Sequence, residues 1–428
     1  MKIGMQTWGS HGDIRPFLAL AEGLQAAGHE VSLVLTCVDS AAYAQVASTQ
    51  GVKITVLASP VLTQEQSDQL GMAAIKAIDP MRQIADLLRA SFDPVEDAMF
   101  EAAQTLSAES DLLIGHYFLH PLSIAAEQAG RPYVSVLLSH AGVPSAFSHP
   151  LGLFGAWKPG NRLLWWLTRL ALNRTLKHYP DRLRRLAGLP ATRDIVTQVW
   201  MSPHLTLVGV SPQICERQQD WEASVQVIGF LDMPNMALEG TLPDTLSAFL
   251  AAGEPPVYMT LGSWMPKDLP NQALTLKLLT EAATLAGCRA IIQSMCAGDC
   301  GFLSSEQVLY VPAAPHHAIF PHCELVVHHG GAGTTQAATL AGKPSVVVAH
   351  ISEQEHWGAE LRRMGIGGKP AKRRQATAAS LAQQIRVVRN APAMRAAAQA
   401  VALPMRAENG VAEAVKLIGQ RFAGEGRA

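Results

Sequence analysis

The sequence has 428 residues, 48% of them hydrophobic and 16% charged, with a formal net charge of −1. This length suits two ordinary domains with a large core, and the near-neutral charge argues against a nucleic-acid partner. Six scattered cysteines without a C-x-x-C pair argue against a disulfide framework or zinc cluster. Without a signal peptide or an apolar run of about 18 residues, the chain is expected in the cytoplasm.

The first half of the chain alternates short apolar strands with helices. Residues 2–8 indicate a strand, and the helix after it has Pro16 near its first turn and ends at Gly28. Further strands are predicted at 31–35, 52–57, 111–115, 133–138, 205–210 and 225–230. Strands that alternate with helices predict a parallel α/β sheet.

The same pattern restarts in the second half, after a stretch of about 231–248 that is rich in Pro, Asn and Gly. A strand and turn are predicted at 256–263, further strands at 289–293 and 308–311, and a helix over 271–286. The alanine-rich tail is mostly helical. The sequence therefore predicts two Rossmann-like halves joined by a linker.

A glycine-rich turn stands out in LVVHHGGAGTTQAATLAG (325–342). The pattern predicts a buried strand, a turn through Gly331 and Gly333, and a helix opened by Thr334. Such a turn presents bare N–H groups and the positive end of a helix dipole to a phosphate, and His329 adds a donor. The turn has no lysine and no G-x-G-x-x-G spacing, so it fits neither a P-loop nor a dinucleotide fingerprint.

The residues after this helix suit a sugar. A strand is predicted at 344–350, followed by the loop SEQEHWG (352–358) at its carboxyl end. Glu353 and Gln354 thus stand where ligands lie in a doubly wound sheet. A carboxylate and an amide beside a phosphate site suit sugar hydroxyls, so the pattern indicates a nucleotide-sugar.

The chain closely resembles the family 1 glycosyltransferases, the UDP-glycosyltransferase superfamily, in the run YVPAAPHHAIFPHCELVVHHGGAGTTQAATLAGKPSVVVAHISEQEHWG (310–358). Within that superfamily it is most similar to sterol glucosyltransferases, glycopeptide-antibiotic glycosyltransferases and rhamnolipid rhamnosyltransferase. The resemblance is also strong at 3–28 and is weak at 60–110 and 140–200. It implies the GT-B fold, in which two Rossmann-like domains face each other across a cleft.

The expected domains follow from the restart of the strand pattern and from this resemblance. Residues 1–230 form an acceptor-binding domain, and 231–248 form the linker. Residues 249–410 bind the nucleotide-sugar. A helix within 411–428 crosses back to the first domain, which the apolar spacing in that segment permits.

The resemblance also implies a donor-binding set: Gly12, Ser263, Ala314, His329, Gly331, Gly333, Thr334, Glu353 and Gln354. Ser263 matches a turn position near the phosphates or sugar, and the backbone of Ala314 matches the contact to the nucleobase. Family members usually have aspartate at the position of Glu353 and proline at the position of Ala349. These differences leave the identity of the sugar undecided. Because Ala337 replaces a frequent glutamate, the choice between UDP and dTDP also stays open.

The loop GSHGDIRP places the candidate base at Asp13, at the carboxyl end of the first strand. It resembles the GSRGDxxP of the sterol and glycopeptide branch. Asp13 also stands where a helix N-cap belongs, so capping alone is the alternative. His11 is the second candidate base, and Gly12 lets the loop approach the diphosphate. His116 is expected to contact the acceptor or the base, with a packed core histidine as the alternative.

No metal ion and no cofactor are expected, because the helix dipole, the backbone and His329 serve the phosphates. His316, His317 and His322 have spacing too irregular for a metal site. The nucleotide-sugar itself is a co-substrate.

The acceptor region is expected in the broken, apolar stretch 140–157 and the helix NRLLWWLTRLALNRTLKH (161–178). A lipophilic acceptor with a hydroxyl group follows. The helix has no acidic residue, and its spacing places on one stripe Arg162, Trp166, Arg169, Asn173 and Lys177. A surface helix packed on the first domain and a helix in contact with the inner membrane face are the two interpretations.

The leading hypothesis is an inverting, metal-independent glycosyltransferase that moves a hexose from a UDP- or dTDP-sugar to a lipophilic acceptor. Inversion is implied by the family alone. One alternative is a non-catalytic nucleotide-sugar-binding protein that assists another enzyme. The other is a nicotinamide oxidoreductase, against which the missing G-x-G-x-x-G after the first strand argues.

Overall fold

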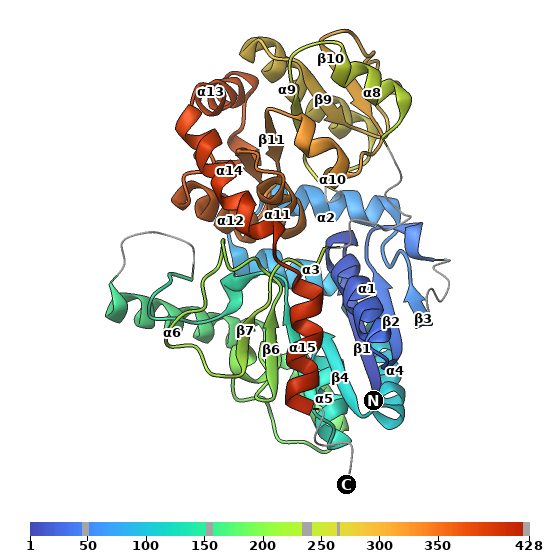
Figure 1. Ribbon diagram of the computed structural model, residues 1–428. Coiled ribbons are helices and arrows are strands. Elements are labelled where there is room, and N and C mark those ends of the chain that lie inside the picture. The colour runs from blue at the N-terminus through green and yellow to red at the C-terminus, as the bar shows by residue number, and fades with distance from the viewer. Residues whose placement is uncertain (45–50, 151–156, 233–241, 263–265, 423–428) are drawn as a thin grey trace. The chain divides into compact units, whose positions relative to one another are not determined.

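The computed structural model describes residues 1–44, 51–150, 157–232, 242–262 and 266–422, and the chain divides into two compact units (Figure 1). Unit 1 comprises Met1–Gln66, Asp79–Met233 and Glu408–Ala428, and unit 2 comprises Ser67–Ile78 and Pro234–Ala407. Of the predicted linker 231–248, residues 233–241 lie outside the described residues, and helix α8 (Asp244–Ala251) begins within it.

Unit 1 is built on a seven-stranded sheet in the order β3-β2-β1-β4-β5-β6-β7, with every neighbouring pair parallel. Its strands are β1 (Lys2–Gly9), β2 (Glu30–Cys37), β3 (Lys53–Ala58), β4 (Leu112–His116), β5 (Tyr133–Leu137), β6 (Leu205–Val208) and β7 (Val225–Val227). All five residues of β4 and of β5 are buried, as expected for strands covered on both faces.

The helices of unit 1 cover this sheet, and they include the last helix of the described chain. They are α1 (His11–Ala26), α3 (Pro80–Ser91), α4 (Glu96–Glu109), α5 (His120–Gln128), α6 (Lys158–Leu176), α7 (His178–Leu186) and α15 (Gly410–Phe422). Red α15 packs against blue α1 in Figure 1. A Cβ at Gly23 would overlap Val411, so this glycine lets the two helices approach closely.

Unit 2 is built on a six-stranded parallel sheet in the order β10-β9-β8-β11-β12-β13. Its strands are β8 (Val257–Thr260), β9 (Ala290–Gln293), β10 (Val308–Val311), β11 (Leu325–His328), β12 (Ser345–Ala349) and β13 (Ala371–Lys372). Its further helices are α9 (Leu269–Ala286), α10 (His316–Ile319), α11 (Ala332–Leu340), α12 (Ser352–Arg363), α13 (Ala378–Arg389) and α14 (Pro392–Arg406), and most of α2 (Gln64–Lys76) clusters with it.

The two parallel α/β sheets confirm the predicted fold class, but several helix starts were predicted wrongly. Residues 352–358 form the first turns of α12 rather than a loop. Helix α1 begins at His11 rather than near Pro16, so Pro16 lies inside the helix. Across the part of the chain described here, no helix is long and apolar enough to span a bilayer.

Candidate functional site

Each sheet has one place where the strand order reverses. In unit 1 the chain runs outward from β1 to β3 on one side and continues from β4 on the other. In unit 2 the reversal lies between β8 and β11. Ligands of open α/β sheets bind at the carboxyl ends of the strands at such points, and the predicted site residues gather there in both units.

The glycine-rich turn of unit 2 forms a cradle at the N-terminus of α11. Gly330 has a φ of +90°, and a Cβ there would lie 2.7 Å from the carbonyl oxygen of Gln354, so only glycine fits. Gly331 is the N-cap of α11, and no side chain caps the helix. Gly333 is exposed, and a Cβ there would meet nothing within 4 Å. An uncapped helix N-terminus of this kind is the arrangement that suits an anion.

His329 lies against this cradle between two glycines. A Cβ at Gly331 would overlap Nε2 of His329, and a Cβ at Gly262 would lie 2.6 Å from Cε1 of the same ring. The Nδ1 atom is buried and makes no hydrogen bond within the part of the chain that the structure describes. Burial, with smaller effects from His350, His328 and His316, holds the pKa of His329 well below 6.5. The neutral ring directs Nε2 toward Gly331, beside the helix N-terminus.

Two more histidines support the turn, and sequence reasoning gave neither a role. His328 accepts a hydrogen bond from the Gly330 N–H at 3.1 Å through Nδ1, and burial lowers its pKa to about 3. His350 bonds the carbonyl oxygen of Leu261 at 3.0 Å and stacks on His329, with ring centroids 6.1 Å apart. A histidine closing an otherwise apolar strand, as in SVVVAH, was the available signal for His350.

Glu353 and Gln354 lie in the first turn of α12. The side-chain oxygen of Gln354 accepts from the backbone N–H groups of His350 at 2.8 Å and Ile351 at 3.4 Å. Glu353 accepts from Nε1 of the fully buried Trp357 at 2.6 Å. Both side chains therefore stabilise the start of α12. Only the polar atoms that these bonds do not use, the second oxygen of Glu353 and the amide nitrogen of Gln354, remain for a ligand.

The other predicted donor residues are spread along the same edge. Thr334 is the third residue of α11. Ala314 lies between β10 and α10, and α10 packs against α11. Ser263 lies outside the described residues. His316 stacks on Phe320, with centroids 4.4 Å apart.

Asp13 lies in unit 1, at the carboxyl end of β1. It is the third residue of α1, while Ser10 is the N-cap, so the predicted N-cap position is wrong by three residues. Its Oδ2 accepts from the backbone N–H of Ser10 at 2.8 Å and from the Ser10 hydroxyl at 2.9 Å. Gly9 has a φ of +141°, and a Cβ there would overlap the carboxylate.

His116 faces the other oxygen of Asp13 across the sheet reversal. Its Nε2 lies 3.5 Å from Oδ1 of Asp13, and the side chain is buried. Neither ring nitrogen makes a hydrogen bond with another of the described residues. Buried polar atoms without partners are costly, so this imidazole is a candidate for contact with a substrate.

His11 and Gly12 form the first turn of α1 with Asp13. Nδ1 of His11 forms a short hydrogen bond with the hydroxyl of Tyr43. Burial raises the pKa of Tyr43, so this hydroxyl stays protonated. The contact ties Nδ1 of His11 to Tyr43, and only Nε2 remains for a substrate. A Cβ at Gly12 would meet only the Ser10 hydroxyl, at 3.7 Å.

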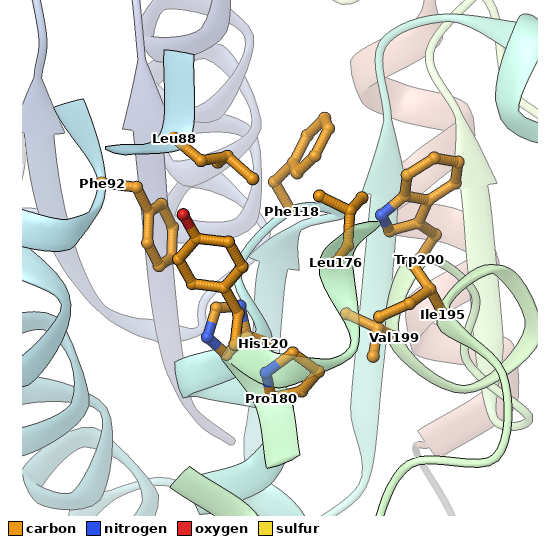
Figure 2. A pocket seen from close by; sticks show the side chains of 10 residues that line it. Leu88, Phe92, Phe118, His120, Leu176, Pro180, Ile195, Val199 and Trp200 are labelled. Carbon is orange, nitrogen blue, oxygen red and sulfur yellow. The ribbon is translucent and has the colours of Figure 1, made fainter. Parts of the chain in front are cut away.

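An apolar pocket of about 300 Å³, counting its open mouth, lies in unit 1 beside this pair. Figure 2 shows Leu88, Phe118 and Trp200 among its lining side chains. His120, at its edge, is tied to the buried carboxylate of Glu96 at 2.6 Å. Phe118 stacks on His116, with ring centroids 6.2 Å apart. One wall of the pocket therefore touches the histidine that faces Asp13.

Known protein families match both units. Residues 3–138 match the model of the glycosyltransferase family 28 N-terminal domain, and 291–419 match that of the erythromycin biosynthesis protein CIII-like C-terminal domain.

Two curated relatives and one solved structure extend this match over nearly the whole chain. The chain is 28% identical to O-mycaminosyltylonolide 6-deoxyallosyltransferase of Streptomyces fradiae, over 98% of this chain and 97% of that protein. It is 28% identical to a sterol 3-beta-glucosyltransferase of Arabidopsis thaliana, over 97% of this chain and 67% of the relative. The crystal structure of glycosyltransferase VinC in complex with dTDP superposes with a TM-score of 0.65 at 20% identity, covering 99% of this chain and all of that one. This likeness confirms the predicted GT-B fold.

Proposed function

This chain belongs to the family 1 glycosyltransferases, and we propose that it moves a hexose from a UDP- or dTDP-sugar to a hydroxyl group of a lipophilic small molecule. The reaction inverts the anomeric carbon and needs no metal ion. The observation that carries the proposal is the cradle of α11, where Gly331 and Gly333 leave the helix N-terminus open beside the neutral ring of His329.

The cradle supplies what a departing diphosphate needs. Backbone N–H groups and the helix dipole stabilise the charge that develops on the leaving oxygen, and His329 adds a donor. These fixed dipoles take the part that a divalent cation plays in other transferases. The dTDP bound to VinC and the 6-deoxysugar named for the Streptomyces relative favour a dTDP-sugar, whereas the sterol glucosyltransferase name leaves UDP-glucose open.

Asp13 acts on the acceptor. Its Oδ1 takes the proton of the acceptor hydroxyl while the hydroxyl oxygen forms a bond to the anomeric carbon. The bond from that carbon to the diphosphate oxygen breaks, and the nucleoside diphosphate leaves with the electron pair. His116 lies 3.5 Å from Oδ1 and orients the carboxylate or the hydroxyl.

The acceptor is lipophilic because the space next to this pair is apolar. The pocket is lined by Leu88, Phe92, Phe118, His120, Leu176, Tyr179, Pro180, Ile195, Val199 and Trp200. These side chains favour an apolar group of the acceptor next to the reacting hydroxyl.

Release of nucleoside diphosphate from a panel of UDP- and dTDP-sugars, with a mixed pool of lipid and phenolic acceptors, tests the proposal. Asp13→Asn keeps an oxygen to accept from Ser10 but cannot take a proton, and Asp299→Asn, at an exposed position of unit 2, is the matched control. Acceptor-dependent release should be lost only in Asp13→Asn and should survive EDTA.

Three other results would change the proposal. Equal activity in both variants would remove Asp13 as the base and direct attention to His11. Loss of release in EDTA would refute metal independence. Binding of a nucleotide-sugar without release by the wild type would refute the transferase itself.

A further inference from the structure

Helix α6 carries two apolar faces, and only one of them packs against its unit. Asn161, Trp165, Leu172 and Leu176 are buried. Leu163, Trp166, Leu167 and Leu170 are 57%, 59%, 46% and 56% exposed, at the i, i+3, i+4 and i+7 spacing that normally marks a core face. The preceding Trp157 is 71% exposed. A contiguous exposed stripe of this kind marks an interaction surface.

The charged residues of the helix itself have a single sign. Residues 158–177 contain five basic residues and no Asp or Glu. Arg162 and Arg174 are exposed, and Lys158 lies 4.1 Å from the ring centroid of Phe147, which is itself exposed. Arg169 and Asn173, two members of the polar stripe expected from the sequence, donate to Asp194 at 2.9 Å and 3.0 Å. These two side chains are therefore already engaged within unit 1.

We propose that this face of α6, defined by Leu163, Trp166, Leu167 and Leu170, docks on a membrane surface that contains anionic lipids. An apolar stripe with tryptophan, flanked by arginine and lysine and without acids, fits the boundary between headgroups and acyl chains. The leucines enter that boundary, the indole lies at headgroup level, and the guanidinium groups meet lipid phosphates. The charge complementarity selects an anionic bilayer over a neutral protein partner.

Flotation of the full chain with vesicles tests this docking without any transferase activity, so the result is independent of the proposed reaction. Vesicles of phosphatidylglycerol and phosphatidylcholine are compared with vesicles of phosphatidylcholine alone. Binding should be strong only to the anionic vesicles and should weaken with added salt.

Paired variants locate the surface. Leu163→Ser with Leu170→Ser should weaken partitioning about tenfold or more, because two apolar anchors leave the boundary. Leu274→Ser with Leu285→Ser on α9, where both leucines are also exposed, is the matched control and should bind as the wild type does. Arg162→Glu with Arg174→Glu should abolish binding, whereas Lys277→Glu with Arg362→Glu, at exposed positions of unit 2, should not.

Fluorescence and oligomeric state complete the test. Anionic vesicles should shift the tryptophan emission of the wild type to the blue, and Trp157→Phe with Trp166→Phe should remove this shift. Equal flotation of the α6 and α9 leucine variants would overturn the proposal, as would no flotation at all or equal binding to phosphatidylcholine. A wild-type dimer that becomes a monomer in Leu163→Ser with Leu170→Ser would assign the face to a second copy of the chain and refute the membrane.

Discussion

The substitution Gly333→Ala separates a ligand-binding role of the glycine-rich turn from a structural one. Gly333 is the second residue of α11, and a Cβ there would meet no atom within 4 Å. The protein itself therefore has no steric reason for glycine at this position. Alanine is the better helix former by up to about 1 kcal/mol, so the variant should be as stable as the wild type or slightly more stable.

Binding of the nucleotide should respond in the opposite direction. A methyl group at the N-terminus of α11 takes the space through which a phosphate reaches the backbone N–H groups. Losing one charged hydrogen bond costs about 1.5–3 kcal/mol. The Kd for UDP or dTDP should therefore rise about 10- to 150-fold, since each 1.4 kcal/mol is a factor of ten.

Calorimetric titration of free UDP and dTDP, together with the midpoint of thermal unfolding, measures both effects. Gly419→Ala in α15 is the matched control, because a Cβ there also meets nothing within 4 Å and the residue lies in unit 1. It should share the gain in stability and leave nucleotide binding unchanged. A Gly333→Ala variant that binds both nucleotides within about twofold of the wild type would refute the cradle as the phosphate site.

Three further predictions concern unit 2 and the Asp13 pair. Burial lowers the pKa of His328 to about 3 and of His350 and His356 to about 4, so each gains a proton on unfolding below pH 6.5. The stability gained from these neutral histidines is fully present above pH 6.5. It is lost as the pH falls from 6.5 toward the pKa values of the folded state. The free energy of unfolding should therefore fall by about 2 kcal/mol per histidine between pH 7 and 5, and His356→Gln should reduce the slope in urea titrations; an equal slope would contradict this. Glu353→Asp withdraws the carboxylate by one methylene and should change the KM for nucleotide-sugars without changing the Kd of the free nucleotide; equal effects on both would argue against a sugar contact. His116→Phe keeps the ring packing but should lower kcat about tenfold or more with an unchanged unfolding midpoint, whereas unchanged kcat would make His116 a packed core residue.

The strands were predictable because strands buried on both faces are short continuous apolar runs, as at 133–138 and 344–350. Helix α12 was missed because its buried positions include polar residues, Gln354, His356 and Glu360. Gln354 bonds the backbone N–H groups of His350 and Ile351, and Glu360 bonds Arg363, contacts that an apolar periodicity cannot reveal. The start of α1 was placed too late because Pro16 is usual in a first turn, yet here it lies inside the helix.

The candidate residues were predictable from local patterns, whereas a contact of His116 with the base or the acceptor was expected only through the family resemblance. Asp13 and His116 come from the ends of β1 and β4, which become neighbours only through the strand order of the sheet. The hydrogen bond of Tyr43 to His11 likewise joins the segment after β2 to the start of α1. Contacts of this kind depend on topology, so a local pattern supplies the chemistry of a site and not its geometry.

Asp13 shows how a helix-capping residue and a candidate base can be the same side chain. Its Oδ2 holds the N–H and hydroxyl of Ser10, while Oδ1 faces Nε2 of His116 at 3.5 Å. The two interpretations that the sequence left open therefore concern different oxygens of one carboxylate. Gly9 has no side chain and so leaves room for the Asp13 carboxylate. The bonds to Ser10 fix the rotation of that carboxylate, so Oδ1 points in one direction before any acceptor binds. In the proposed reaction, this arrangement would preorganise the base, since a carboxylate held in place spends no rotational freedom when it takes the proton.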